Sequence, residues 1–271
     1  MSKENAGPRK KTPSKWLLRW GLRVAALVVA LVAVQIGLLA FPQVLLSKDV
    51  QVGSVALHYR GATNPSMAAI AQEADHRLQS GGFGDPERPK DVFFFPQQDL
   101  YAFFARLARV PPQAQGFGIS FLGNSFVSGP RVEALGEENG HSPSYSVWEG
   151  SASHTVAHEI AHIILIDSIG RKEWLGLPHW KQEGLPEYIA NIGLIRADTA
   201  ASLQRRIEIL LDDAEWSGPR SWDRIHYEAG LMVEFLLDVK EVGFRAILDE
   251  AVTREETYSE MVDWLERLPT S

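Results

Sequence analysis

Two histidines four residues apart, with a glutamate directly after the first, are the residues of this chain best suited to chemistry. They are His158 and His162, which enclose Glu159 in the run His-Glu-Ile-Ala-His. On an α-helix this spacing puts both imidazoles on one face, close enough to bind one metal ion. The pattern is typical of a Zn²⁺ site in which the glutamate lies beside the ion. We therefore expect Zn²⁺ as the cofactor, His158 and His162 as two ligands, and Glu159 as the catalytic base that takes a proton from water.

A catalytic zinc site needs a third ligand from the protein. The chain has no cysteine, so this ligand must be His, Asp or Glu. The pattern with a further histidine six residues after the second is absent, because Ser168 occupies that position. His154 precedes His158 by four residues, yet it would lie about 12 Å from His162 along a helix axis, too far to share one ion. We interpret His154 as a helix-start or rim residue.

Glu183 and Glu187, in the run Trp-Lys-Gln-Glu-Gly-Leu-Pro-Glu-Tyr over residues 180–188, supply two carboxylates after the histidines. With these two motifs the chain resembles the gluzincin zinc metallopeptidases, the thermolysin-like and aminopeptidase-like zincins with a peptidase MA-type domain. The resemblance covers roughly residues 150–250. It implies Glu183 as the third zinc ligand and Glu187 as the acceptor of a hydrogen bond from His158. Pro186 fits badly inside a helix, so we expect the helix to begin near Glu183, which leaves open which carboxylate binds the metal.

The resemblance also implies a tyrosine at the start of a later helix, which would donate a hydrogen bond to the oxyanion formed during amide hydrolysis. Tyr227 is the candidate, with a packing role as the alternative. Its neighbour His226 is expected to point elsewhere on the helix. In gluzincins an edge strand ahead of the zinc helix pairs with an extended peptide, and residues 116–128 are the candidate here. The Gly-x-Met-Glu-Asn strand of aminopeptidases is absent, so an endopeptidase is expected.

Two other functions are compatible with these motifs. One is a catalytically weak, gluzincin-like zinc-binding scaffold, and the other is an envelope interaction protein in which the motif is accidental. The simplest structural alternative is a core helix with two satisfied histidines and a surface glutamate. Against that alternative, an ionised Glu159 between apolar neighbours in a buried helix would be costly without a partner.

The first 42 residues have the composition of a membrane anchor. Seven basic residues and one acidic residue occupy positions 1–23, and residues 24–41 are apolar except for Gln35. This run is long enough to cross most of a bilayer. The positive-inside rule then predicts a cytoplasmic basic tail over 1–21, a single-pass transmembrane anchor over 22–42 in the cytoplasmic membrane, and an extracytoplasmic catalytic part, periplasmic in a bacterium. A cleaved signal peptide is the alternative, but the run is longer than usual and no Ala-x-Ala site follows it.

Beyond residue 23 the chain is acidic, with 20 basic and 33 acidic residues. Such a surface repels phosphate backbones, so we exclude nucleic acid as a partner. The expected partners are a peptide or protein substrate and the membrane, and the oligomeric state stays open.

Hydrophobic periodicity predicts an α+β fold behind the anchor. We expect an α+β N-terminal subdomain over 43–149 with a small mixed sheet, and a mainly helical metallopeptidase-like subdomain over 150–271, together a zincin-like domain. The expected elements are a strand at 50–60, a helix at 65–80, a strand at 91–95, a helix at 98–110, a bent strand pair at 116–128, a loop at 130–150, a helix from Ser151 or Ser153 to near Gly170, and mostly helix over 178–268.

Overall fold

The structure, a computed structural model, describes residues 15–61, 65–85, 87–129, 152–195, 200–212 and 221–268. The expected loop at 130–150 and the first fourteen residues of the expected tail lie outside these ranges. The chain forms two compact units, residues 1–41 and 42–271. Each unit is described by itself.

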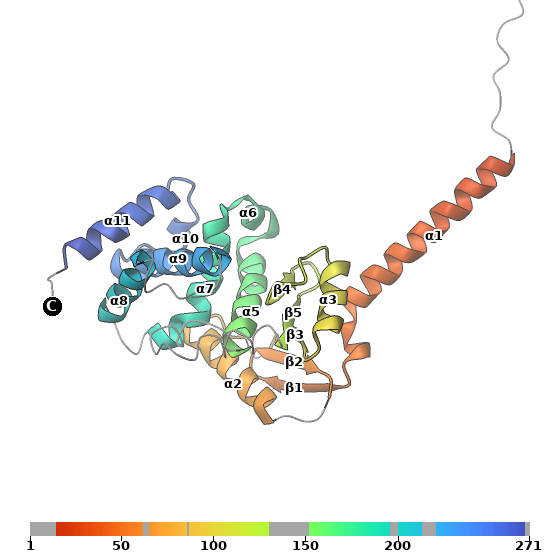
Figure 1. The fold of residues 1–271 in the computed structure, drawn as a ribbon, viewed down its shortest axis with the longest axis horizontal. Helices are drawn as coiled ribbons and strands as arrows, with labels where there is room; N and C mark the ends of the chain where they lie inside the picture. Colours follow the sequence, from red (N-terminus) through yellow and green to blue (C-terminus); the bar gives the residue numbers. More distant parts are fainter. Residues whose placement is uncertain are drawn as a thin grey trace, which may run out of the picture. The chain divides into compact units, whose positions relative to one another are not determined.

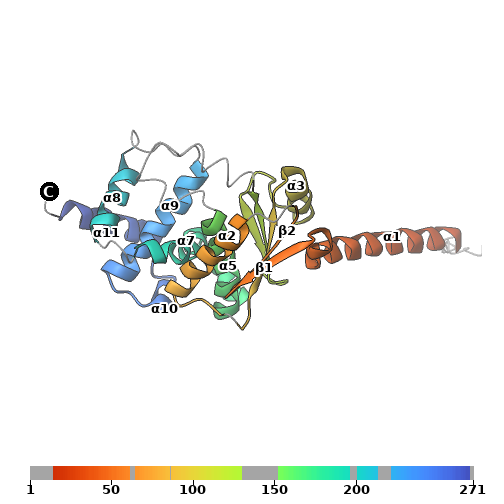
Figure 2. The ribbon, with the colours of Figure 1, turned by 90° about the horizontal axis from the view of Figure 1, so that it is seen from below.

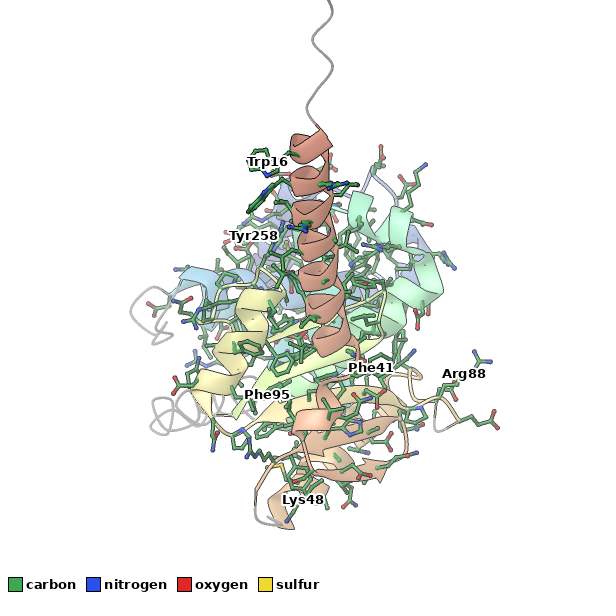
Figure 3. All side chains as sticks on the ribbon, turned by 90° about the vertical axis from the view of Figure 1, so that its right-hand side faces the viewer. Trp16, Phe41, Lys48, Arg88, Phe95 and Tyr258 are labelled. Carbon is green, nitrogen blue, oxygen red and sulfur yellow. The ribbon has the colours of Figure 1, made fainter. Side chains whose placement is uncertain are left out.

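The first unit is one long helix, α1 (Lys15–Ala40), with Trp16 near one end and Phe41 just beyond the other (Figure 3). By length and composition, Arg19–Ala40 is able to cross a membrane, a test that a signal sequence near the N-terminus also passes. The helix begins at Lys15, inside the segment expected to be a cytoplasmic tail, because Lys, Leu, Arg and Trp continue a helix without a breaker.

The second unit contains a mixed sheet of five strands in the order β1-β2-β3-β5-β4 (Figures 1 and 2). The three central strands run parallel, and each edge strand pairs antiparallel with its neighbour. This sheet and the helices around it confirm the expected mixture of helix and sheet. The strands are β1 (Lys48–Val52), β2 (Val55–Tyr59), β3 (Lys90–Phe95), β4 (Gly116–Ile119) and β5 (Asn124–Ser128).

The prediction of one strand over residues 50–60 is wrong, because a tight turn divides it into β1 and β2. Val52 pairs with Val55, so Gly53 and Ser54 form a two-residue turn. Gly53 has a φ of 50°, which glycine adopts without strain. The alternation of apolar residues in fact changes phase at Gly53 and Ser54, because Val52 and Val55 are three residues apart, and this break in the sequence marks the reversal.

Both faces of the sheet are covered by helices (Figure 2). On one face α3 (Gln98–Leu107) supplies Phe104, which packs on Phe126 of β5 with ring centroids 5.5 Å apart. Phe126 also stacks on Phe117 of β4 at 4.7 Å. The other face is covered by α2 (Pro65–Ser80) and α5 (Ala152–Ile169), so the helix with the His-Glu-x-x-His run lies against the sheet.

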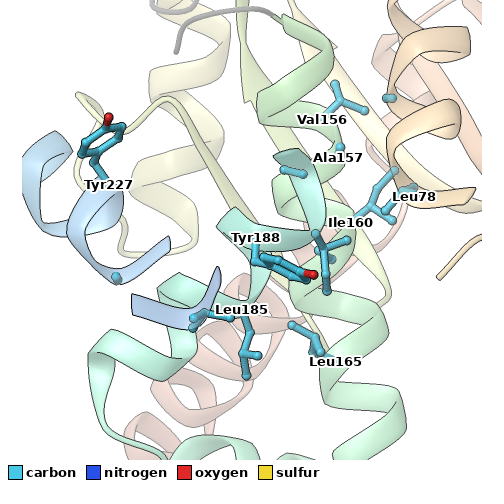
Figure 4. Packing of buried hydrophobic residues seen from close by; sticks show 14 of the residues in the cluster. Leu78, Val156, Ala157, Ile160, Leu165, Leu185, Tyr188 and Tyr227 are labelled. Carbon is cyan, nitrogen blue, oxygen red and sulfur yellow. The ribbon is translucent and has the colours of Figure 1, made fainter. Parts of the chain in front are cut away.

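The rest of the second unit is helical and packs around α7 (His179–Ile195), which contacts α2, α5 and α9. Figure 4 shows Leu185 and Tyr188 of α7 facing Ile160 and Leu165 of α5. Arg77 of α2 donates a hydrogen bond to a backbone oxygen of α7 at 2.8 Å. The remaining elements are η1 (Pro42–Leu45), α6 (Arg171–Gly176), α8 (Ala200–Leu211), α9 (Ser221–Glu234) with its π-helical extension η2 (Phe235–Val239), α10 (Phe244–Ile247) and α11 (Arg254–Glu266).

The prediction that the second motif's helix begins near Glu183 is also wrong, because α7 begins at His179 and contains Pro186. The backbone N–H groups of Lys181 and Gln182 donate to the oxygen of Pro178 at 2.9 and 3.2 Å, which closes the first turn. Pro186 comes after this turn is complete. It therefore bears the full cost of a proline inside a helix, one missing backbone hydrogen bond and crowding against the carbonyl of Gln182, and the packing of α7 on its neighbours offsets that cost.

The crossing of α7 and α9 depends on Gly184. A Cβ atom there would lie 2.8 Å from the backbone carbon of Ala229 and 2.9 Å from Val233 Cγ2, with the oxygen of Ala229 nearer still. Since backbone cannot yield cheaply, Gly184→Ala should lower the free energy of unfolding by about 1 to 3 kcal/mol. Urea unfolding of the detergent-solubilised full chain, followed by circular dichroism in a chelator, measures this.

Gly176→Ala is the matched control, because a Cβ atom there meets nothing within 4 Å. It should leave stability unchanged or raise it by up to about 1 kcal/mol. Equal stabilities for the two variants would contradict the close approach of α7 to α9.

Candidate metal centre

Three side chains from two helices converge where α5 passes α7. His158 Nε2 and His162 Nε2 of α5 are 3.1 Å apart. Glu183 Oε2 of α7 lies 3.5 Å from the first nitrogen and 3.3 Å from the second. The sequence placed both imidazoles on one helical face, and the packing of α7 brings the carboxylate to them. Among the described residues, these three form a group whose ligand atoms lie close enough together to hold a metal ion.

The spacing of the three ligand atoms fits a small tetrahedral ion. Zn²⁺ bonds of about 2.0 to 2.1 Å at a tetrahedral angle separate ligand atoms by about 3.3 Å. The separations of 3.1, 3.3 and 3.5 Å bracket that value. Two imidazoles and one carboxylate are also a donor set that zinc accepts, and three ligands leave a fourth position for water or substrate. The residues therefore fit the expected ion.

Glu187 stands behind His158 instead of in the ligand group. Its Oε2 accepts a hydrogen bond from His158 Nδ1 at 2.9 Å, so Nε2 is the ring nitrogen that is directed at the centre. Its other oxygen lies 3.1 Å from His154 Nε2 and accepts from Asn191 Nδ2 at 3.1 Å. Both oxygens of the Glu187 carboxylate are thus held by contacts, which fixes the direction in which the carboxylate faces His158.

His154 is near the start of α5, as expected, but it is buried and does not lie at a rim. Its Nε2 lies beside the carboxylate of Glu187, and its ring lies 6.1 Å from that of His158, centroid to centroid. Asn191 was not foreseen. It lies four residues after Glu187, and this helical spacing is the one signal in the sequence that could have indicated it.

The pKa values of His158 and Glu183 are shifted in the directions that favour a positive charge on the imidazole and a negative charge on the carboxylate. Burial opposes a charged His158, but hydrogen bonds to Glu183 and Glu187 outweigh it and raise the pKa of this imidazole to about 10. Burial alone would raise the pKa of Glu183, yet hydrogen bonds to His158 and His162 hold it well below its usual range. The carboxylates are therefore ionised, and a proton or a metal cation between the imidazoles balances them.

Glu159 is buried between α5 and the edge strand β4. Its carboxylate lies under Gly116, where a Cβ atom would be 2.5 Å from Oε1. Ser125 of β5 donates to the backbone oxygen of Glu159 at 3.3 Å, which ties this turn of α5 to the sheet. Burial raises the pKa of Glu159, against the lowering effect of His162 and His158. A raised pKa suits a group that accepts and returns a proton near neutral pH.

The prediction that His226 points away is wrong. His226 Nε2 lies 3.6 Å from Glu183 Oε2, and its ring stacks with His158 at 5.9 Å between centroids. Tyr227 instead donates its hydroxyl hydrogen to the backbone oxygen of Arg206 in α8 at 3.2 Å. Figure 4 shows the Tyr227 ring apart from the side chains of α5. Neighbouring residues on a helix differ by about 100° in direction, so His226 faces the centre and Tyr227 faces α8.

His179, at the start of α7, also faces the carboxylate, with Nε2 3.7 Å from Glu183 Oε1. The side chain is half-exposed, unlike that of Glu183. It precedes Glu183 by four residues, and this spacing was available in the sequence.

Neither a protein-family model nor any curated protein matches the chain. The assignment of site residues therefore depends on the geometry described above.

Removal of a ligand should abolish metal binding. His162→Ala and Glu183→Ala each leave two ligands, so the full chain dialysed against trace Zn²⁺ should retain much less than one equivalent by elemental analysis, against one for the unchanged protein. His76→Ala is the control, because His76 is an exposed histidine of α2. Equal zinc content in all four proteins would contradict the centre.

Proposed function

We propose that the chain is a membrane-anchored zinc metallopeptidase of the gluzincin type, with a zincin-like catalytic domain. The observation that carries the proposal is the convergence of His158, His162 and Glu183 at tetrahedral spacing, with Glu159 next to one ligand in sequence. A scaffold site would need the three ligands. It would not need Glu159, a buried carboxylate beside them, because burial of a carboxylate lowers the stability of the folded protein.

The proposed chemistry is amide hydrolysis by water. Zn²⁺, when bound by the three ligands, supplies a Lewis acid that polarises a carbonyl and acidifies water. Glu159 accepts the proton of the attacking water and delivers it to the departing amine. Glu187 holds the His158 ring in place through the reaction. The apolar packing around α5 keeps bulk water away from Glu159.

Support for a peptide substrate comes from the edge of the sheet. Within the described ranges β4 has one neighbour, β5. Just before β4, Ser128 N donates to Gln115 O at 2.8 Å, so Gln115 and Ser128 are a hydrogen-bonded pair. In an antiparallel pair of strands, every second residue directs its N–H and C=O groups at the partner strand. The N–H and C=O groups of Gly116 and Gly118 therefore point away from β5. An extended peptide can pair with these groups beside Glu159. An endopeptidase is the form of the activity that we propose.

His226 takes the part that the sequence assigned to Tyr227. Its Nε2 approaches Glu183 from α9, and its ring stacks on that of His158. A ring nitrogen there is suited to donate a hydrogen bond to the oxyanion of the reaction.

The proposed location is the cytoplasmic membrane, with α1 as a single-pass anchor and the second unit on the extracytoplasmic side. The concentration of basic residues before the apolar part of α1 supports this orientation. The anchor would restrict substrates to peptides and proteins near the membrane.

Glu159→Gln tests the catalytic proposal. The amide keeps the size of the side chain but cannot accept the proton, so hydrolysis of an internally quenched peptide library by the zinc-loaded full chain should fall by about 10² to 10⁴-fold, with zinc content unchanged. Equal hydrolysis by wild type and variant would refute the peptidase and leave a zinc-binding scaffold.

Two substitutions on α9 separate His226 from Tyr227. His226→Ala should lower the rate at saturating peptide by about 10² to 10³-fold, as expected for loss of an oxyanion donor. Tyr227→Phe removes a hydrogen bond to Arg206, so it should lower the unfolding free energy by about 1 kcal/mol and change the rate little. The reverse pattern of rates would return the role to Tyr227.

A further inference from the structure

The side of β4 that faces α5 carries no side chain. Gly116 and Gly118 alternate with Phe117 and Ile119, which are buried in the aromatic cluster on the opposite face of the sheet. Both glycines therefore lie over the same turn of α5, the one that contains Glu159. They differ in how much room they leave for its carboxylate.

Gly116 is the one whose missing Cβ makes room. A Cβ atom there would be 2.5 Å from Oε1 of Glu159 and 2.9 Å from its carboxyl carbon, distances that real contacts do not reach. At Gly118 the nearest atom would be Oε2 at 3.8 Å, an ordinary contact. Gly116 does not have a positive φ, so its backbone would accept alanine. The glycine is needed for space and not for conformation.

The helix cannot move aside to relieve such a contact. Ser125 binds the backbone oxygen of Glu159 at 3.3 Å, and Ile160 and Ala161 beside it are fully buried. The end of the Glu159 side chain is the part that is free to yield. A methyl group at position 116 would therefore displace the carboxylate and leave His158, His162 and Glu183 where they are.

We propose that Gly116 is a positioning residue, whose missing side chain forms the socket that holds the Glu159 carboxylate against the edge strand and beside the metal ligands. The consequence for catalysis rests on the proposed function, whereas the steric relation between Gly116 and Glu159 does not. A displacement of about 1 Å in a catalytic group lowers rates on the order of 10²-fold.

The catalytic test uses Gly116→Ala in the full chain, solubilised in detergent and loaded with Zn²⁺. With the library peptide that the wild type cleaves fastest, the rate at saturation should fall on the order of 10²-fold, with KM and zinc content unchanged. Gly118→Ala should lose at least tenfold less. Equal losses in the two variants, or a change confined to KM, would overturn the positioning role.

A double-mutant cycle on thermal unfolding tests the steric relation without any activity. Gly116→Ala should lower the unfolding midpoint by about 2 to 10 °C when Glu159 is present, and by much less in a Glu159→Ala background, where the carboxylate is gone. Gly118→Ala should behave alike in both backgrounds. The same loss in both backgrounds for Gly116→Ala would overturn the proposal.

The outcomes distinguish the two proposals. If the wild type lacks hydrolysis but the cycle shows the coupling, the peptidase proposal fails and the socket stands. If Gly116→Ala does not fold, Glu159→Asp is added, because the shorter side chain removes one methylene from the contact. Restored folding and zinc binding then support the socket, and continued unfolding overturns it.

Discussion

Charge buried between α5 and α7 is the constraint on which the rest of the second unit depends. Glu187 is buried and Glu183 is nearly so, and carboxylates at such positions are several kcal/mol unfavourable without compensation. His154 and His158 compensate Glu187, and the imidazoles of His158 and His162 lie beside Glu183. Since each partner must be within hydrogen-bonding distance, the two helices have little freedom to slide or rotate against each other.

Close packing supplies the stiffness that this arrangement needs. On its outer sides α5 lies against the sheet, and α7 lies against α2 and α9. Leu185 and Tyr188 pack against the apolar side chains of α5 (Figure 4), and Gly184 lets α9 approach the helix backbone. His226 reaches the centre because of that approach. The helices α5 and α7 therefore contribute residues both to the apolar core and to the polar centre.

The spacing of residues in the sequence predicted those features of the structure that depend on a single helix or strand. The i, i+4 separation of His158 and His162 sufficed to put them on one face. Apolar periodicity predicted the helix at 65–80, an apolar run predicted the strand at 91–95, and the helix expected at 98–110 is present but ends at Leu107. Contacts between different helices and strands were harder to predict from the sequence. The resemblance to gluzincins supplied Glu183 as a ligand, but the direction of His226 depends on the rotation of α9, which packing against α7 and α8 fixes. Asn191 and Gly116 act through neighbours that are distant in sequence, so no local pattern marked their roles.

Because α7 makes four contacts with three neighbouring helices, its length is more restricted than its composition. Within about two turns it presents Glu183 to the histidines of α5, Gly184 to α9, Glu187 to His158, and the backbone oxygen of Ala190 to Arg77 of α2. Inserting or deleting one residue ahead of Glu183 would turn all later positions by about 100°. All four contacts would then be lost together, whereas a change of residue at one position affects only one of them. We therefore expect this segment to tolerate many substitutions but no insertion or deletion.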